Sequence, residues 1–132
     1  MAITSYRDLE VYQRSMAALV QVHKLVLGFP DFERYGLTDQ MRRASKSVPA
    51  NIAEGYGRRA SAKEFKHFLS IALGSTNEMA VHLEVARALE YAGSELDGAL
   101  IEEYTVIGKM LFRLMESWRT IPAGQRRSSS SL

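Results

Sequence analysis

Seven basic side chains fall between positions 42 and 66, and this cluster is the strongest chemical signal in the chain. The bases are Arg42, Arg43, Lys46, Arg58, Arg59, Lys63 and Lys66, and the accompanying acids are Glu54 and Glu64. Seven bases against two acids leave a local charge of +5, whereas the whole chain carries +2 at pH 7. Lysine and arginine bind phosphate groups additively and in a salt-sensitive way. The cluster therefore favours a polyanion-binding surface; the alternative is a solvated face with local ion pairs, such as Glu54 with Arg58.

The next part of the chain has the opposite charge. Between positions 73 and 103 there are seven acids and one base, a local charge of −6. The acids are Glu78, Glu84, Glu90, Glu95, Asp97, Glu102 and Glu103, and the base is Arg87. Such an uneven distribution suits either a polyanion partner or head-to-tail self-association.

Other kinds of chemistry lack the residues they need. The chain has no Cys, which excludes a thiol nucleophile, a disulfide scaffold and a zinc finger. Glu64 and His67 form one Glu-x-x-His pair, whereas a di-iron bundle needs two. Gly55 and Gly57 are not followed by the Gly-Lys-Ser/Thr of a phosphate-binding loop. We therefore expect no catalytic residues, no metal and no cofactor.

The positions of apolar residues predict four helices and no strand. The helical spacing covers residues 6–27, 38–53, 62–92 and 96–118. Short connections between them predict an all-α fold, an antiparallel up-down four-helix bundle over residues 1–122. Pro49 lies inside the second helix, so we expect a kink or short break there. Residues 123–132 are polar and predict a disordered tail.

Particular residues are expected to begin the helices and to fill the core. Ser5, Thr38 and Ser61 are candidate N-caps, and Glu64 would complete a capping box with Ser61. The third helix should bury Phe65, Phe68 or Leu69, Ala72, Thr76, Met79, Leu83, Ala86 and Glu90. The fourth should bury Leu100, Tyr104, Ile107, Leu111, Leu114 and Trp118. The apolar stripes of the first and third helices are wider than one seam requires, which predicts a subunit interface.

The motif at 47–55 has two interpretations. In one, Asn51 and Glu54 receive a partner at the end of the bundle. In the other, which we favour, the motif is structural: Pro49 frees a carbonyl that Asn51 can bind, and Gly55 supplies an unusual backbone angle. No aromatic platform is evident beside the bases, so base-specific readout is not expected.

The run Asn51-Ile52-Ala53-Glu54-Gly55, with the stretches 6–12, 35–44, 63–65 and 68–75, resembles a known family. These are the four-helix-bundle proteins named after reading frames inside intervening sequences of bacterial 23S rRNA genes, also called the S23 family. The resemblance covers residues 6–118. It implies a homopentamer and kinship with accessory proteins of diversity-generating retroelements, which are basic pentamers that bind reverse transcriptase and nucleic acid. The resemblance does not imply a reaction, because the family has no established enzymatic activity.

These observations together predict a non-enzymatic, cytoplasmic homopentamer with no membrane segment. Its expected partner is RNA, DNA or a nucleic-acid enzyme such as a reverse transcriptase, bound by the seven bases at one end of the bundle. The alternative is a protein–protein adaptor without affinity for nucleic acid. A small-molecule role in the bundle or in the channel of a ring is a third possibility that no convergent polar set supports.

Overall fold

The helices lie close to where the sequence predicts them. The computed structural model describes residues 2–91 and 93–120. The long helices are α1 (Glu10–Leu25), α2 (Leu37–Gly57), α3 (Ala62–Ala88) and α4 (Ser94–Ser117). Three short 3-10 helices flank them: η1 (Tyr6–Asp8), η2 (Val26–Gly28) and η3 (Asp31–Glu33). The described residues include no strand, and the predicted all-α four-helix bundle is confirmed.

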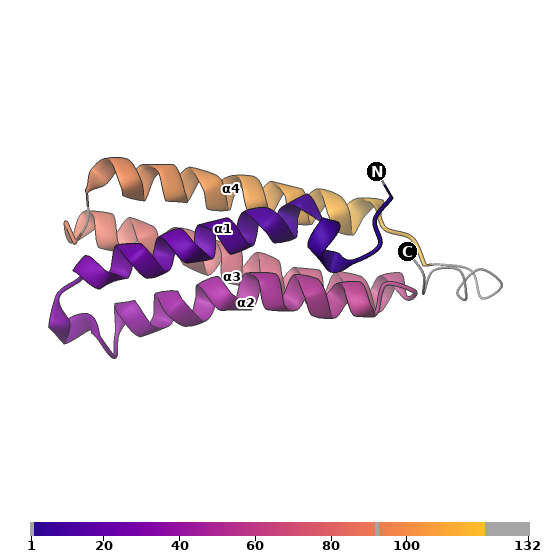
Figure 1. Cartoon of the computed structure of the whole chain (residues 1–132), viewed down its shortest axis with the longest axis horizontal. Helices are drawn as coiled ribbons and strands as arrows, with labels where there is room; N and C mark the ends of the chain where they lie inside the picture. The colour runs from indigo at the N-terminus through magenta and orange to yellow at the C-terminus, as the bar shows by residue number, and fades with distance from the viewer. Residues whose placement is uncertain (1, 92, 121–132) are drawn as a thin grey trace.

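The four helices surround one core, with α1 and α3 on opposite corners. α2 and α4 each contact both α1 and α3, and Figure 1 shows α1 in front of α3, between α4 above and α2 below. At one end, the Tyr91 hydroxyl donates to Glu33 over 2.8 Å. At the other end, Trp118 Nε1 donates to the carbonyl of Arg59 over 2.9 Å. The end of α3 thus meets the α1–α2 connection, and the end of α4 meets the α2–α3 turn.

The core follows the predicted registers closely. Leu100, Tyr104, Ile107 and Leu111 of α4 are buried. On α3 the buried residues are Phe65, Leu69, Ala72, Thr76, Met79, Leu83 and Ala86. The prediction of Glu90 as a core residue is wrong. α3 ends before it, and Glu90 is exposed with a positive φ of 59°.

The helix starts agree with the sequence only in part. Ser5 caps η1 and Ser61 caps α3, as predicted. Thr38 is not a cap, because α2 begins one residue earlier and the Leu37 N–H donates to Glu33 Oε1 over 3.1 Å. The Glu64 carboxylate does not complete a capping box with Ser61, because it contacts Arg58 instead.

α2 runs without a break through Pro49, so the short break considered for this segment is absent. The side chain of Pro49 is buried. A kink at this residue stays a prediction. The predicted tail at 123–132 lies outside the described residues.

Candidate nucleic-acid interface

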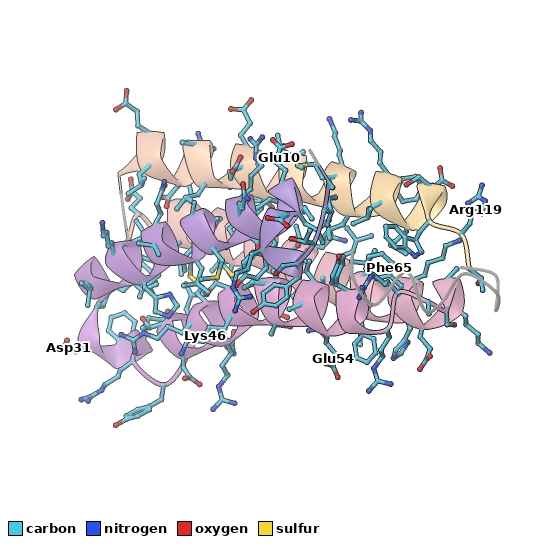
Figure 2. All side chains as sticks on the ribbon, turned by 45° about the vertical axis from the view of Figure 1, so that its right-hand side comes forward. Glu10, Asp31, Lys46, Glu54, Phe65 and Arg119 are labelled. Carbon is cyan, nitrogen blue, oxygen red and sulfur yellow. The ribbon has the colours of Figure 1, made fainter. Side chains whose placement is uncertain are left out.

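The seven predicted bases form two groups and not one. The α2 group contains Arg42, Arg43 and Lys46, and the turn group contains Arg58, Arg59, Lys63 and Lys66. Because α2 is one continuous helix, Arg42 and Arg58 lie about 24 Å apart along its axis. Figure 2 shows Lys46 and Glu54 at separate points along this helix. The expectation that all seven meet at one end of the bundle is therefore wrong.

The α2 group combines one paired arginine with two bases that have no carboxylate partner. Arg43 Nε donates to Asp39 over 2.9 Å on an exposed surface. Within the described residues, Arg42 and Lys46 have no carboxylate within 4.0 Å. Arg42 is half-buried in a hollow of about 240 Å³ that Arg34 also lines. Arg34, from the α1–α2 connection, is thus a further base that the sequence analysis did not include.

In the turn group, Arg58 is held by two carboxylates. Its guanidinium contacts Glu54 at 3.4 Å, which is the pair expected from the sequence, and Glu64 at 3.2 Å. The Arg59 guanidinium lies 4.3 Å from the centre of the Tyr56 ring and donates to the Tyr56 carbonyl. Exposed ion pairs of this kind contribute about 0.2–1 kcal/mol, so phosphate can exchange with the carboxylates.

Aromatic rings do lie beside the turn group, contrary to the sequence-based expectation. Phe68 is 5.1 Å from the Arg58 guanidinium and 5.2 Å from the His67 ring. Both rings line a hollow of about 470 Å³ with Arg58, Lys63 and Glu64. Such a juxtaposition of rings and cations suits the stacking of unpaired bases. The residues come from the end of α2 and the first two turns of α3, and only the reversal of the chain brings them together.

The second half of α4 and the residues that follow it add three bases that the sequence analysis missed. They are Lys109, Arg113 and Arg119. Gly108 of α4 faces Leu73 of α3, which fixes the register of the two helices. Arg119 sits between Trp118 and Thr120, which hydrogen-bond to Arg59 and Ala62 of the α2–α3 turn. Antiparallel pairing of α3 with α4 about Gly93 would have predicted this placement. We call the half of the bundle that carries the turn group and these bases the basic half.

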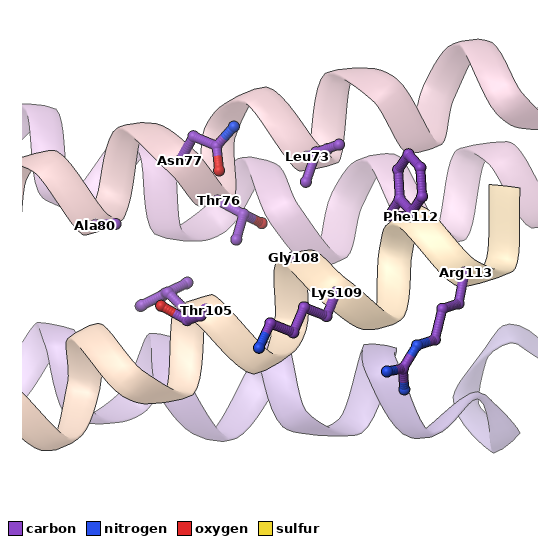
Figure 3. Close-up of a pocket in the computed structure, with 10 residues that line it drawn as sticks. Leu73, Thr76, Asn77, Ala80, Thr105, Gly108, Lys109, Phe112 and Arg113 are labelled. Atoms are coloured by element: carbon purple, nitrogen blue, oxygen red, sulfur yellow. The ribbon is translucent and has the colours of Figure 1, made fainter. Parts of the chain in front are cut away.

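Lys109 and Arg113 also border a shallow groove between α3 and α4 (Figure 3). The groove has a volume of about 380 Å³ and is lined on the α3 side by Leu73, Thr76 and Ala80. It exists because residues such as Ala80 and Gly108 are small. The residues that line it include no Asp, Glu or His, so the groove lacks the carboxylate or imidazole that general acid–base catalysis uses most often.

The motif at 47–55 holds α2 against α3. Asn51 Nδ2 donates to the carbonyl and hydroxyl of Ser47, at 2.9 and 3.0 Å. The Ser75 hydroxyl of α3 donates to the Ser47 hydroxyl oxygen over 2.8 Å. Asn51 therefore does not bind the carbonyl of Ser45, which is the one that Pro49 deprives of its donor, and that part of the prediction is wrong.

Gly55 is needed for close approach and not for an unusual backbone angle, since no described glycine has a positive φ. A Cβ at this position would lie 3.0 Å from both Phe65 Cδ1 and Phe68 Cβ. Glu54, the last predicted member of the motif, is exposed and pairs with Arg58. Asn51, Glu54 and Gly55 thus make contacts inside the chain, and Pro49 is buried.

The half of the bundle opposite the basic half, which we call the acidic half, contains a buried carboxylate. Asp97, in the first turn of α4, is fully buried, and neither carboxylate oxygen has a hydrogen-bond partner among the described residues. Burial raises the pKa of Asp97, and the positive charge of Arg87 opposes this rise. Burial likewise raises the pKa of the Tyr104 phenol. Asp97 lies in the first turn of α4, away from the basic half. Tyr104 lines the groove that Lys109 and Arg113 border, but its side chain is buried, so we leave both groups out of the candidate site.

Within residues 2–91 and 93–120, no three His, Asp or Glu side chains come together as metal ligands would. No helix in the same ranges combines the length and apolar character needed to cross a membrane.

The comparisons with known proteins agree with the fold. The family profile described as "23S rRNA-intervening sequence protein" matches residues 7–113. The crystal structure of a protein of unknown function from the S23 ribosomal protein family of Bacteroides thetaiotaomicron VPI-5482 is similar, with a TM-score of 0.71 and 25% sequence identity. That match covers 81% of this chain and 99% of the other. The comparison with curated proteins gives no match.

Proposed function

Because the chain belongs to the 23S rRNA-intervening sequence protein family, we propose that it is a non-enzymatic, homopentameric scaffold of the cytoplasm. Its ligand is nucleic acid, bound by the α2 group and the basic half. A protein that itself works on nucleic acid, such as a reverse transcriptase, is a further partner of the same surface. The family name records where such genes occur and does not specify a reaction.

The observation that carries this proposal is the length over which the bases extend. Arg42 and Arg58 are about 24 Å apart along α2, and Lys109 and Arg113 of α4, with Arg119 just after it, add further positive charge in the basic half. A single small anion contacts only one such group. An extended polyanion contacts several at once, and its affinity grows with each phosphate engaged. Five copies in a ring would repeat this surface around the assembly.

The rings of His67 and Phe68 favour unpaired bases over a duplex. They lie in the same hollow as Lys63, which has no carboxylate within 4.0 Å among the described residues. We expect single-stranded RNA or DNA to bind more tightly than duplex DNA of the same length.

The test is a salt-titrated binding assay on nuclease-treated full-length protein, with fluorescently labelled single-stranded RNA, structured RNA and duplex DNA. We expect affinity to fall steeply between 50 and 200 mM salt. Arg42→Glu with Arg43→Glu, and separately Lys63→Glu, should weaken binding to every sequence. Each phosphate that a variant no longer binds should reduce the salt slope by about 1.

Arg87→Glu is the matched control for Lys63→Glu, because it makes the same change of charge in the acidic half. Equal losses of affinity in the control and the test variants would assign the effect to net charge and remove the named residues from the site. Light scattering on the same samples gives the number of subunits, and a mass other than five chains would refute the pentamer.

The adaptor function is the second candidate, and the internal ion pairs favour it. Arg43 is paired with Asp39, and Arg58 is shared by Glu54 and Glu64. In an adaptor these bases would serve only to stabilise α2 and the turn. An oligomer that binds none of the three nucleic acids at 50 mM salt would support this function over nucleic-acid binding.

A further inference from the structure

α1 carries an apolar stripe on the face that points away from the core. Met16, Val20 and Leu27 are exposed, and Val20 is 47% exposed. Met16 and Val20 are four residues apart and lie on one side of α1, and Leu27 follows in η2, the 3-10 turn after α1. The buried residues Val22 and Leu25 occupy the opposite side. Within residues 2–91 and 93–120, this stripe therefore has no partner in its own bundle.

α3 carries a second stripe of the same kind. Ile71, Val81 and Val85 of α3 are exposed, as is its C-cap residue Leu89, and Val81 is 55% exposed. They lie opposite the buried seam of this helix. Gly74 lies in the same outward row, and a Cβ built on it would meet nothing within 4 Å. Another backbone can approach α3 closely at this point.

The two stripes lie on opposite sides of the molecule, because α1 and α3 occupy diagonal corners of the bundle (Figure 1). They also lie at the same height. The rings of Phe29 and Tyr91 are 5.5 Å apart and mark one end of the bundle. Leu27 and Val20 lie two and nine residues before Phe29. Leu89 and Val81 lie two and ten residues before Tyr91.

The stripes have opposite charge. The segment 16–28 contains one lysine, Lys24, and no acid. The segment 77–90 contains three acids, Glu78, Glu84 and Glu90, against Arg87. A face with a positive charge and a face with a net negative charge attract each other, and two copies of either face do not.

We propose that copies of this chain assemble head to tail, with the outer face of α1 from one copy packed on the outer face of α3 from the next. Two different surfaces on opposite sides generate a ring or a filament, whereas a two-fold dimer needs one self-complementary surface. Because the two stripes lie at equal heights, successive copies need no shift along the bundle axis, which a closed ring requires and a helical filament does not. This interface rests on the homo-oligomer of the proposed function and specifies how it is built.

The absence of Cys from the chain permits a direct test by site-specific cross-linking. Val20→Cys and Val81→Cys chains, one of them carrying a larger tag, are co-expressed and treated with a short bismaleimide. We expect a cross-linked dimer that contains one chain of each kind, and no cross-linked dimer when either variant is present alone. Cross-linking of Val20→Cys with itself would show a two-fold contact and overturn the proposal.

A second measurement uses light scattering. Val81→Glu should convert the assembly to monomers that keep the helical circular dichroism of the parent. Phe112→Glu is the matched control, since Phe112 is 54% exposed on α4 and lies in neither stripe. It should leave the assembly intact.

The two proposals fail in different ways. A wild-type chain that is monomeric refutes the homo-oligomer and this interface together. A wild-type oligomer that Val81→Glu leaves intact, and that gives no mixed cross-link, refutes only this interface.

Discussion

Gly55 and Phe65 bring α2 and α3 so close together that a methyl group does not fit between them. A Cβ on Gly55 would lie 3.0 Å from Phe65 Cδ1 and 3.3 Å from the Phe65 carbonyl oxygen. Phe65 is fully buried and its ring stacks edge-on with Trp118 at 4.6 Å. The contact thus connects the end of α2, the start of α3 and the end of α4, which is where the turn group of bases is held.

Gly55→Ala should lower the free energy of unfolding by about 1–3 kcal/mol, because overpacking outweighs the better helix propensity of alanine. The measurement is urea unfolding followed by circular dichroism at one fixed protein concentration. Gly98→Ala is the control, since the nearest atom to a new Cβ is the end of the Arg87 side chain at 3.9 Å. That variant should gain stability, up to about 1 kcal/mol. A gain in both variants would show that α2 and α3 can separate without cost.

Glu90→Gly should raise the free energy of unfolding by about 1 kcal/mol, because glycine adopts the left-handed conformation without the steric penalty of a side chain. Glu90 follows α3 in this conformation, with a φ of 59°, and the next N–H, that of Tyr91, donates to the carbonyl of Ala86 over 2.9 Å. Glu90→Ala removes the same charge and keeps the strain, so thermal unfolding should show no comparable gain. Equal gains in both would assign the effect to charge.

Trp118→Phe should lower the free energy of unfolding by about 1–2 kcal/mol. The phenyl ring can still stack on Phe65, but the hydrogen bond from Nε1 to the Arg59 carbonyl is removed, which leaves that acceptor without this donor. Because this is the chain's one tryptophan, circular dichroism is the measurement. Trp118→Ala should cost more, since it also removes the stacking. Identical stabilities for the two variants would show that the indole N–H carries the whole effect.

Asp97→Asn should stabilise the protein at neutral pH and have less effect in acid. Burial raises the pKa of Asp97 in the folded state. A carboxyl with a raised pKa favours folding when protonated, and that contribution is lost as the pH rises through the folded-state value. The gain from the amide should therefore be smallest below the unfolded pKa of about 3.9 and grow toward pH 7. Urea unfolding of both proteins at several pH values measures this difference, and a constant difference would contradict it.

Local sequence patterns determined the helices and most of the core. The register of α3 from Phe65 to Ala86 and that of α4 from Leu100 to Leu111 follow from helical spacing alone, because burial repeats with the period of the helix. Ser5 and Ser61 as caps follow for the same reason, since a cap bonds to backbone within three residues. The family membership also came from residues close together in the chain.

Only the tertiary structure decided how the charges and the exposed apolar residues are distributed in space. The continuity of α2 separates Arg42 from Arg58, although both belong to one stretch of sequence. The pairing of α3 with α4 brings Arg119 to the α2–α3 turn from a distant part of the chain, a contact that no local pattern encodes. The small volume at Gly55 and the opposite positions of Val20 and Val81 likewise depend on which helices are neighbours, and packing of the whole core decides that.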